Sequence, residues 1–180
     1  MIEILAQVLG ILGTIFAFVS FQLKENKKFF MLQALSGCMF ALNFLLLGAY
    51  TGCLLNFINI FRGAVMAGGK KTYKVPWLIA IQALYIIATV FTYTNIFSLI
   101  ALIAQLVGTF AMWSKNGKTI RFLQLFCVSP MWLIHNIFVF SIGGIICEVF
   151  NISSIIVSLI RFGKRGIKKL KEKDLLKDKV

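Results

Sequence analysis

Two pairs of apolar segments carry polar and aromatic side chains in the same order. One shift of the sequence superimposes the two sets: Phe40 on Trp132, Asn43 on His135, Asn56 on Glu148 and Asn59 on Asn151. Within each segment the two residues are three positions apart, so they share one face of a helix. Asparagine amides donate and accept hydrogen bonds, and aromatic rings offer flat apolar surfaces. The pattern predicts that these side chains face one central space and bind a small polar solute there, through Asn59, Asn151, Phe40, Trp132, Asn43 and Asn56.

Glu148 and His135 add groups that exchange protons. Glu148 is the only acidic residue of the apolar segments apart from Glu3, and His135 is the only histidine of the chain. An ionisable side chain inside a membrane is costly and usually faces a cavity or a partner, and histidine titrates near physiological pH. The pair predicts either proton coupling and gating or a static link between helices. Pro130 removes a helix hydrogen bond, which fits either a hinge or an ordinary kink.

The asparagines have an alternative interpretation, since Asn side chains also hydrogen-bond between packed membrane helices. Catalysis is not expected. One histidine and one glutamate are too few for a metal site. No Ser–His–acid set can be assembled, and no Gly-rich phosphate loop precedes a helix. The cysteine spacing fits no metal motif, so we expect no catalytic residues, no metal and no cofactor; the cysteines are Cys38, Cys53, Cys127 and Cys147.

The elements that position these residues are membrane-spanning helices. Hydrophobic residues make up 59% of the chain, and the mean hydropathy of +0.90 is far above that of soluble proteins. A helix needs about 20 apolar residues to cross a bilayer. Apolar stretches of that kind predict seven spans, at 4–23, 29–48, 50–67, 76–94, 96–113, 119–140 and 142–161. The fold class predicted is therefore an all-α integral membrane protein.

The basic residues predict which way the chain crosses. The 19 Lys and Arg residues gather in alternate connections and in the C-terminal tail, while the connections near Tyr50, 93–95 and 141–143 carry no charge. Short basic loops stay cytoplasmic, so the N-terminus is expected outside and the C-terminus in the cytoplasm. This topology accounts for the net charge of +13 without a nucleic-acid partner. The basic tail is expected either on the inner leaflet or in solvent.

The repeat predicts an architecture as well as a site. The fourth span inverts the chain, so the triplets on either side of it run in the same direction, as in parallel-repeat transporters. The first and fifth spans share a Gly-Thr pair, at Gly13-Thr14 and Gly108-Thr109. We expect two parallel triple-helix bundles joined by a linker helix, with boundaries at 1–67, 68–95 and 96–162, followed by a basic tail at 163–180.

The chain resembles two families of membrane proteins. The segments Phe21–Gln33, Leu47–Gly52 and Asn56–Arg62 resemble the YgjV-type bacterial inner-membrane proteins, which implies a location in the bacterial inner membrane. The three-one-three layout is more distantly similar to the SWEET and PQ-loop transporters. That similarity implies substrate contacts by Asn59 and Asn151, with the pocket completed by residues of the second and sixth spans, namely Phe40, Asn43, Trp132 and His135.

The sequence thus favours a transporter of a small polar solute, such as a sugar, that works by alternating access in the lipid bilayer. The similarity to the carriers also allows a homo-oligomer. The second hypothesis is a membrane protein that does not transport, either a sensor or a scaffold subunit. Such a protein would use the helices as a support and the basic tail as its interaction surface.

Overall fold

The structure is a computed structural model that describes residues 1–20, 22, 26–68, 74–114 and 116–177. The described residues are helical and contain no β-strand. The helices are α1 (Ile2–Ser20), α2 (Asn26–Leu46), α3 (Tyr50–Ala67), α4 (Val75–Thr92), α5 (Ile96–Trp113), α6 (Gly117–Leu123), the π-helix η2 (Gln124–Val128), α7 (Ser129–Phe138) and α8 (Ile142–Lys177). They match the predicted segments closely. The basic residues Lys24, Lys70, Lys71 and Lys115 lie outside the described ranges.

Local sequence explains where several helices begin. The turn before α3 contains Gly48 at φ 73°, a backbone conformation that glycine adopts without strain. The helix α4 has Pro76 in its first turn, where the missing N–H costs no helical hydrogen bond. The helix α5 is capped by Asn95, whose side chain accepts a hydrogen bond from the Phe97 N–H at 2.9 Å. Turn and capping residues therefore place these helix ends where the pattern predicted them.

The sixth predicted span is divided into α6, η2 and α7. The π-helix η2 ends immediately before Ser129, and Pro130 stands in the first turn of α7. Proline lacks the N–H of a regular helical ladder, and a single π-turn is a common way for a helix to absorb such an interruption. The structure thus shows one π-turn in an otherwise continuous helix, ending just before Pro130.

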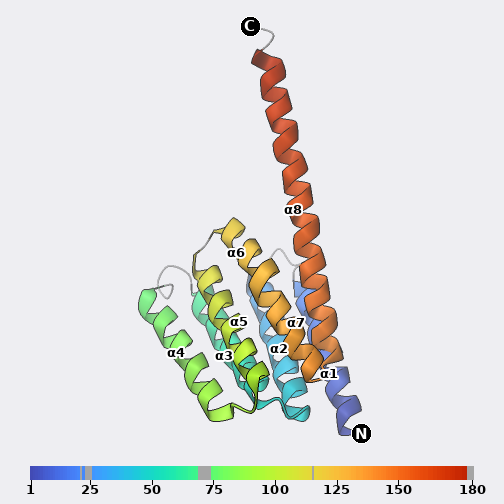
Figure 1. The fold of residues 1–180 in the computed structure, drawn as a ribbon, viewed down its shortest axis with the longest axis vertical. Coiled ribbons are helices and arrows are strands. Elements are labelled where there is room, and N and C mark those ends of the chain that lie inside the picture. The colour runs from blue at the N-terminus through green and yellow to red at the C-terminus, as the bar shows by residue number, and fades with distance from the viewer. Residues whose placement is uncertain (21, 23–25, 69–73, 115, 178–180) are drawn as a thin grey trace.

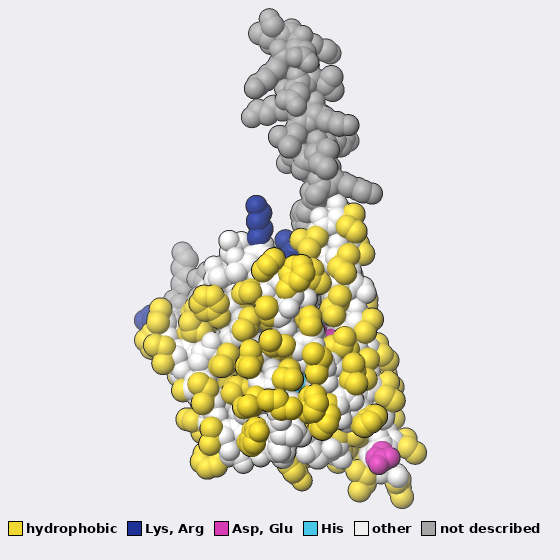
Figure 2. Space-filling model, viewed as in Figure 1, with side chains coloured by type: hydrophobic (Ala, Val, Ile, Leu, Met, Phe, Trp, Pro, Cys, Tyr) yellow, Lys and Arg dark blue, Asp and Glu magenta, His cyan; other side chains and the backbone are white. Residues whose placement is uncertain are grey.

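Four of the described helices are long and apolar enough to cross a membrane: α1, α4, α5 and the Ile142–Ile160 part of α8. Within α2 a shorter apolar stretch covers Met31–Leu46. The surface of the body is largely hydrophobic, with Lys and Arg side chains at the end from which α8 projects (Figure 2). We call this the basic end of the bundle. This distribution suits a protein whose outer surface meets lipid.

The helices run side by side along the bundle (Figure 1), and their contacts close into a ring. In the first part of the chain α2 lies between α1 and α3, and α4 packs against both α3 and α5. The helix α5 contacts α3, η2 and α7, while α8 contacts α7, η2 and α1. The chain thus returns to α1, and the ring surrounds an interior to which α2, α3, α5, α7 and α8 all contribute.

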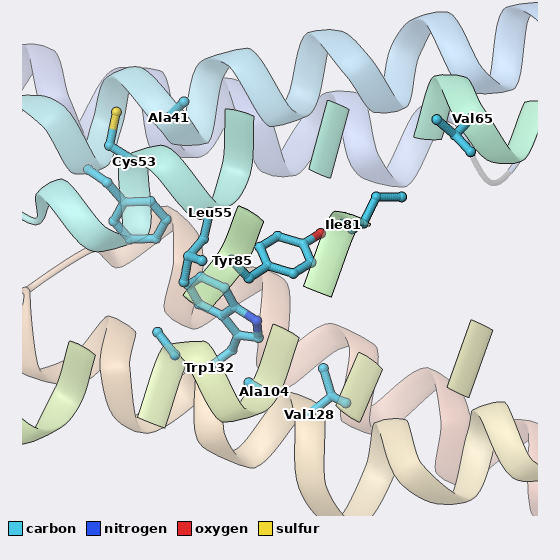
Figure 3. Close-up of a cluster of buried hydrophobic side chains, with 11 residues drawn as sticks. Ala41, Cys53, Leu55, Val65, Ile81, Tyr85, Ala104, Val128 and Trp132 are labelled. Atoms are coloured by element: carbon cyan, nitrogen blue, oxygen red, sulfur yellow. The ribbon is translucent and has the colours of Figure 1, made fainter. Parts of the chain in front are cut away.

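The buried core joins the two parts of the chain. Leu55 of α3, Tyr85 of α4 and Trp132 of α7 converge in one cluster of buried side chains (Figure 3). Leu55 and Tyr85 are fully buried. The cluster occupies the side of the interior next to α4 and α5, so it supports one wall of the interior space described below.

The opposite side of the ring is closed by the crossing of α1 and α8. A Cβ atom on Gly143 would overlap the backbone of Gly10. The two helix backbones therefore touch, as small residues permit in membrane helix pairs. Thr14 Oγ1 also donates a hydrogen bond to the Gly143 carbonyl oxygen at 2.8 Å. This seam has no room for a side chain at Gly143.

Candidate functional site

The interior holds a cavity between α2, α3, α5, η2, α7 and α8. One part has a volume of about 430 Å³, and a second part of about 530 Å³ shares with it residues such as Phe40, Asn59 and Asn151. The second part extends to Met31 near the start of α2 and to Met66 near the end of α3. Both residues lie toward the basic end of the bundle. The volume is that of sites that hold a small organic molecule.

Six of the predicted site residues line this cavity: Phe40, Asn56, Asn59, Trp132, Glu148 and Asn151. They come from both copies of the sequence repeat and from four different elements, α2, α3, α7 and α8. Most of their neighbours along the helices are apolar. The structure therefore brings most of the predicted constellation together around one space.

Tyr85 fixes the orientation of the Asn59 side chain. The buried Tyr85 hydroxyl donates a hydrogen bond to Asn59 Oδ1 at 2.7 Å. Because the amide oxygen is engaged, the Nδ2 group of Asn59 is the part available to the cavity. In Asn56 the amide nitrogen, and not the oxygen, is the engaged group. Its Nδ2 group donates to the Gly52 carbonyl at 2.9 Å, which leaves Oδ1 as its acceptor.

Glu148 belongs to a chain of polar groups on the other side of the cavity. Asn151 Nδ2 donates to Glu148 Oε2 at 3.3 Å, and the Ser129 side chain lies near the Glu148 carboxyl group. Gln124, in the π-helix, donates to Ser129 Oγ at 3.0 Å. The π-turn thus places a glutamine next to this chain, and the amide oxygen of Asn151 is its acceptor group toward the cavity.

His135 lies apart from Glu148. Its ring packs edge-on against Phe44 and Trp132, with centroid distances of 5.4 and 5.3 Å. These rings, with Phe40 beyond Phe44, form the aromatic layer of the interior. Gly52 makes the layer tight, because a Cβ atom there would stand 3.0 Å from both the His135 and the Phe44 rings. The predicted pairing of His135 with Glu148 is therefore not seen.

The aromatic layer separates two spaces. Phe44 and Trp132 line the central cavity, whereas His135 lines a second pocket of about 230 Å³ among the turns opposite the basic end. That pocket also includes Thr51, Asn95 and Ser98. The central cavity thus extends toward the basic end, and aromatic rings stand between it and the other end.

Asn43 also lies outside the cavity. It is fully buried, donates to the Ala6 carbonyl at 2.7 Å and accepts from Ser141 Oγ at 2.7 Å. These bonds join α2 to α1 and to the turn before α8. The expected placement of Asn43 and His135 around the central space is thus corrected. The next residue on each helix lines the cavity instead, Phe44 and Asn136, because positions i and i+4 share a helix face as well as positions i and i+3.

Several cavity residues were not singled out from the sequence. They are Arg62, Gln33, Gln105, Gln124 and Asn136, besides Phe44. Arg62 offered a usable signal, because it continues the three-residue spacing of Asn56 and Asn59 along α3. The positive-inside pattern already accounts for its charge, so the charge alone does not mark a binding residue. The glutamines offered a weaker signal, since single polar residues in spans often serve packing alone.

An all-helical body with an apolar surface and a polar interior defines an integral membrane protein. The family comparison makes this specific: the chain belongs to the bacterial inner membrane protein family Imp-YgjV, whose model matches residues 4–166. It is similar to the inner membrane protein YgjV of Escherichia coli (strain K12), with 24% identity over 170 residues, 91% of this chain and 88% of that protein. No solved structure matches the chain. The protein is thus an inner-membrane protein of the YgjV family.

Proposed function

We propose that the protein transports a small polar solute across the bacterial inner membrane. The observation that carries this proposal is the central cavity, which is lined by polar side chains from both sequence repeats and reaches toward one end of the bundle. Polar groups at this depth are costly unless they meet water or a solute. Phe40 and Trp132 beside Asn59 and Asn151 suit a solute with polar edges and an apolar face, as a sugar has.

The proposed architecture is that of two parallel triple-helix bundles, α1–α3 and α5–α8, with α4 as the linker. Mirrored contacts support it. Thr14 of α1 bonds to the backbone of α8, and its counterpart Thr109 of α5 accepts a hydrogen bond from Arg62 of α3. Gly13 faces α2, while Gly108 faces Val128 of η2. This arrangement is similar to that of SWEET-like carriers, and the site lies between the repeats.

The proposed mechanism is alternating access. With the C-terminus in the cytoplasm, as the basic loops favour, the cavity faces the cytoplasm and the aromatic layer closes the outer side. Release to the outside then requires that Phe44 part from Trp132 and His135, whose rings lie 6.0 and 5.4 Å from it. The π-turn beside Pro130 gives α7 a place to bend during this step.

Uptake into proteoliposomes tests the proposal, with a panel of radiolabelled sugars, polyols and small organic acids. We expect at least one solute to be taken up and the double variant Asn59→Ala/Asn151→Ala to lose that uptake. The control is Ser153→Ala, which removes a polar side chain that is exposed on the same helix as Asn151. Uptake that survives the double variant, or is lost equally in the control, would contradict a central site.

One feature favours a second function, that of a scaffold or sensor. The helix α8 continues to Lys177, well beyond the length that crosses a bilayer, and its last part is rich in lysine. A docking protein would depend on this extension. Deletion of residues 163–180 distinguishes the two functions, because it should leave transport unchanged and abolish docking to a partner.

A further inference from the structure

Arg62 places a positive charge inside the cavity. It lies on α3, is half-buried and lines both parts of the space. Its Nη1 group donates a hydrogen bond at 2.8 Å to Thr109 Oγ1, and Thr109 is fully buried on α5. The guanidinium is therefore held across the contact between α3 and α5. This tether directs it into the interior and not along α3 toward the lipid headgroups.

The charge of Arg62 has no ionic partner among the described residues. The one hydrogen bond that its guanidinium makes to them, to Thr109, is to a neutral hydroxyl and uses one of five N–H donors. Glu148 of α8 lines the same cavity, but the described contacts pair it with Asn151 and not with Arg62. An arginine in a span is costly unless an anion or water meets it. A negative group that enters the cavity would therefore lower the cost of the Arg62 charge.

Arg62 is also well placed relative to the polar groups proposed to bind the solute. It follows Asn59 by three residues, so the two side chains share a helix face and are separated by about 4.5 Å along the axis. Arg62 lies on the basic-end side of Asn59. A solute whose polar body rests at Asn59 and Asn151 would thus present one end to the guanidinium.

We propose that the transported solute is a small organic anion whose carboxylate or phosphate group docks on Arg62. The planar guanidinium fork matches both groups and binds them through paired hydrogen bonds. The remaining polar groups of the solute meet Asn59 and Asn151, and its apolar face meets Phe40 and Trp132. This inference rests on the proposed transport function and specifies the substrate class of the same site.

Matched pairs of solutes test it. The full-length protein in nanodiscs of neutral lipid is titrated with gluconate against glucose, glycerate against glycerol, and glycerol 3-phosphate against glycerol. Binding is followed by tryptophan fluorescence, since Trp132 lines the cavity, and by the melting temperature. We expect at least one anion to bind about tenfold more tightly than its neutral partner, a difference of roughly 1.4 kcal/mol. The carboxylate and phosphate pairs show which group is preferred.

Variants assign the preference to one residue. Arg62→Gln should abolish the difference within a pair, and Arg62→Lys should retain part of it because the charge remains. Thr109→Val removes the tether but keeps the charge, so a preference should persist. The control is Arg121→Gln. It removes a positive charge near the basic end at a residue that does not line the cavity.

Three results would overturn the assignment. In the first, both members of each pair bind equally and Asn59→Ala weakens them alike, which rejects the anion and keeps the transport site. In the second, anions are preferred but Arg62→Gln changes nothing. In the third, only anionic lipid added to the nanodiscs stabilises the protein, which makes Arg62 a headgroup site. Failure of the transport proposal itself would appear separately, as no uptake of any solute by the wild type.

Discussion

The contact between α1 and α8 can be tested by adding one methyl group. In Gly143→Ala the new Cβ would overlap the Gly10 backbone and stand 2.6 Å from the Ile11 nitrogen. Atoms of this kind pack at roughly 3.5–4.0 Å, and the Gly10 backbone would lie closer still, so the helices must separate by about 1.5 Å. The Thr14 hydrogen bond to Gly143, now 2.8 Å long, would then be stretched beyond its useful range.

The expected cost follows from three terms. Overpacking costs typically about 1–3 kcal/mol, and an interhelical hydrogen bond in a membrane contributes about 0.6–1.7 kcal/mol. Alanine is favoured over glycine within a helix by up to about 1 kcal/mol. Together these terms predict that Gly143→Ala lowers the free energy of unfolding by about 1–3 kcal/mol.

The matched control is Gly63→Ala, because a Cβ on Gly63 of α3 would meet no atom within 4 Å. This substitution should stabilise the protein slightly or leave it unchanged. The assay is unfolding in mixed micelles with increasing mole fraction of SDS, followed by circular dichroism. If Gly143→Ala is as stable as Gly63→Ala, the helix backbones do not touch at this position and the described crossing of α1 and α8 is refuted.

Three further substitutions give distinct expected results. Tyr85→Phe removes the hydrogen bond to Asn59, so stability should fall by about 1 kcal/mol and solute affinity should fall with it; unchanged affinity would show that the orientation of the Asn59 amide is unimportant. Asn43→Ala removes two buried hydrogen bonds and should cost roughly 2–4 kcal/mol in micelle unfolding, while affinity of the folded protein changes little; Ser141→Ala should show part of this loss. Asn95→Ala removes the cap of α5 and should cost about 1 kcal/mol, measured as a lower melting temperature, whereas Asn95→Asp should keep the wild-type value.

The helices could be predicted from the sequence because lipid imposes a simple requirement. A span must be long, apolar and internally hydrogen-bonded, and basic connections alternate with uncharged turns between the spans. The start of α4 at Pro76 follows from the same kind of local rule. The division at η2 could not be placed in advance. Pro130 predicts an interruption of the helical hydrogen bonds. The position of the π-turn, however, depends on local side-chain contacts such as the hydrogen bond between Gln124 and Ser129.

The candidate site was predicted less completely than the fold. Residue type identified Asn59, Asn151 and Glu148, since polar groups in spans are few. It could not fix the rotation of α2 and α7 to within one residue. Asn43 therefore faces α1, where it meets a backbone carbonyl, and an apolar residue takes the cavity position beside it. Side-chain chemistry shows which residues can bind, whereas packing against neighbouring helices decides which of them face the cavity.

The length of α8 has a consequence for measurement. The helix carries Glu148 and Asn151 in the cavity and continues unbroken to Lys177. At 1.5 Å per residue, the part beyond Asn151 is about 39 Å long. A tilt of about 10° around the cavity would then move its far end by roughly 7 Å, which distance measurements between spin labels resolve. A spin label near the end of α8 would thus report small movements of the helix at the cavity.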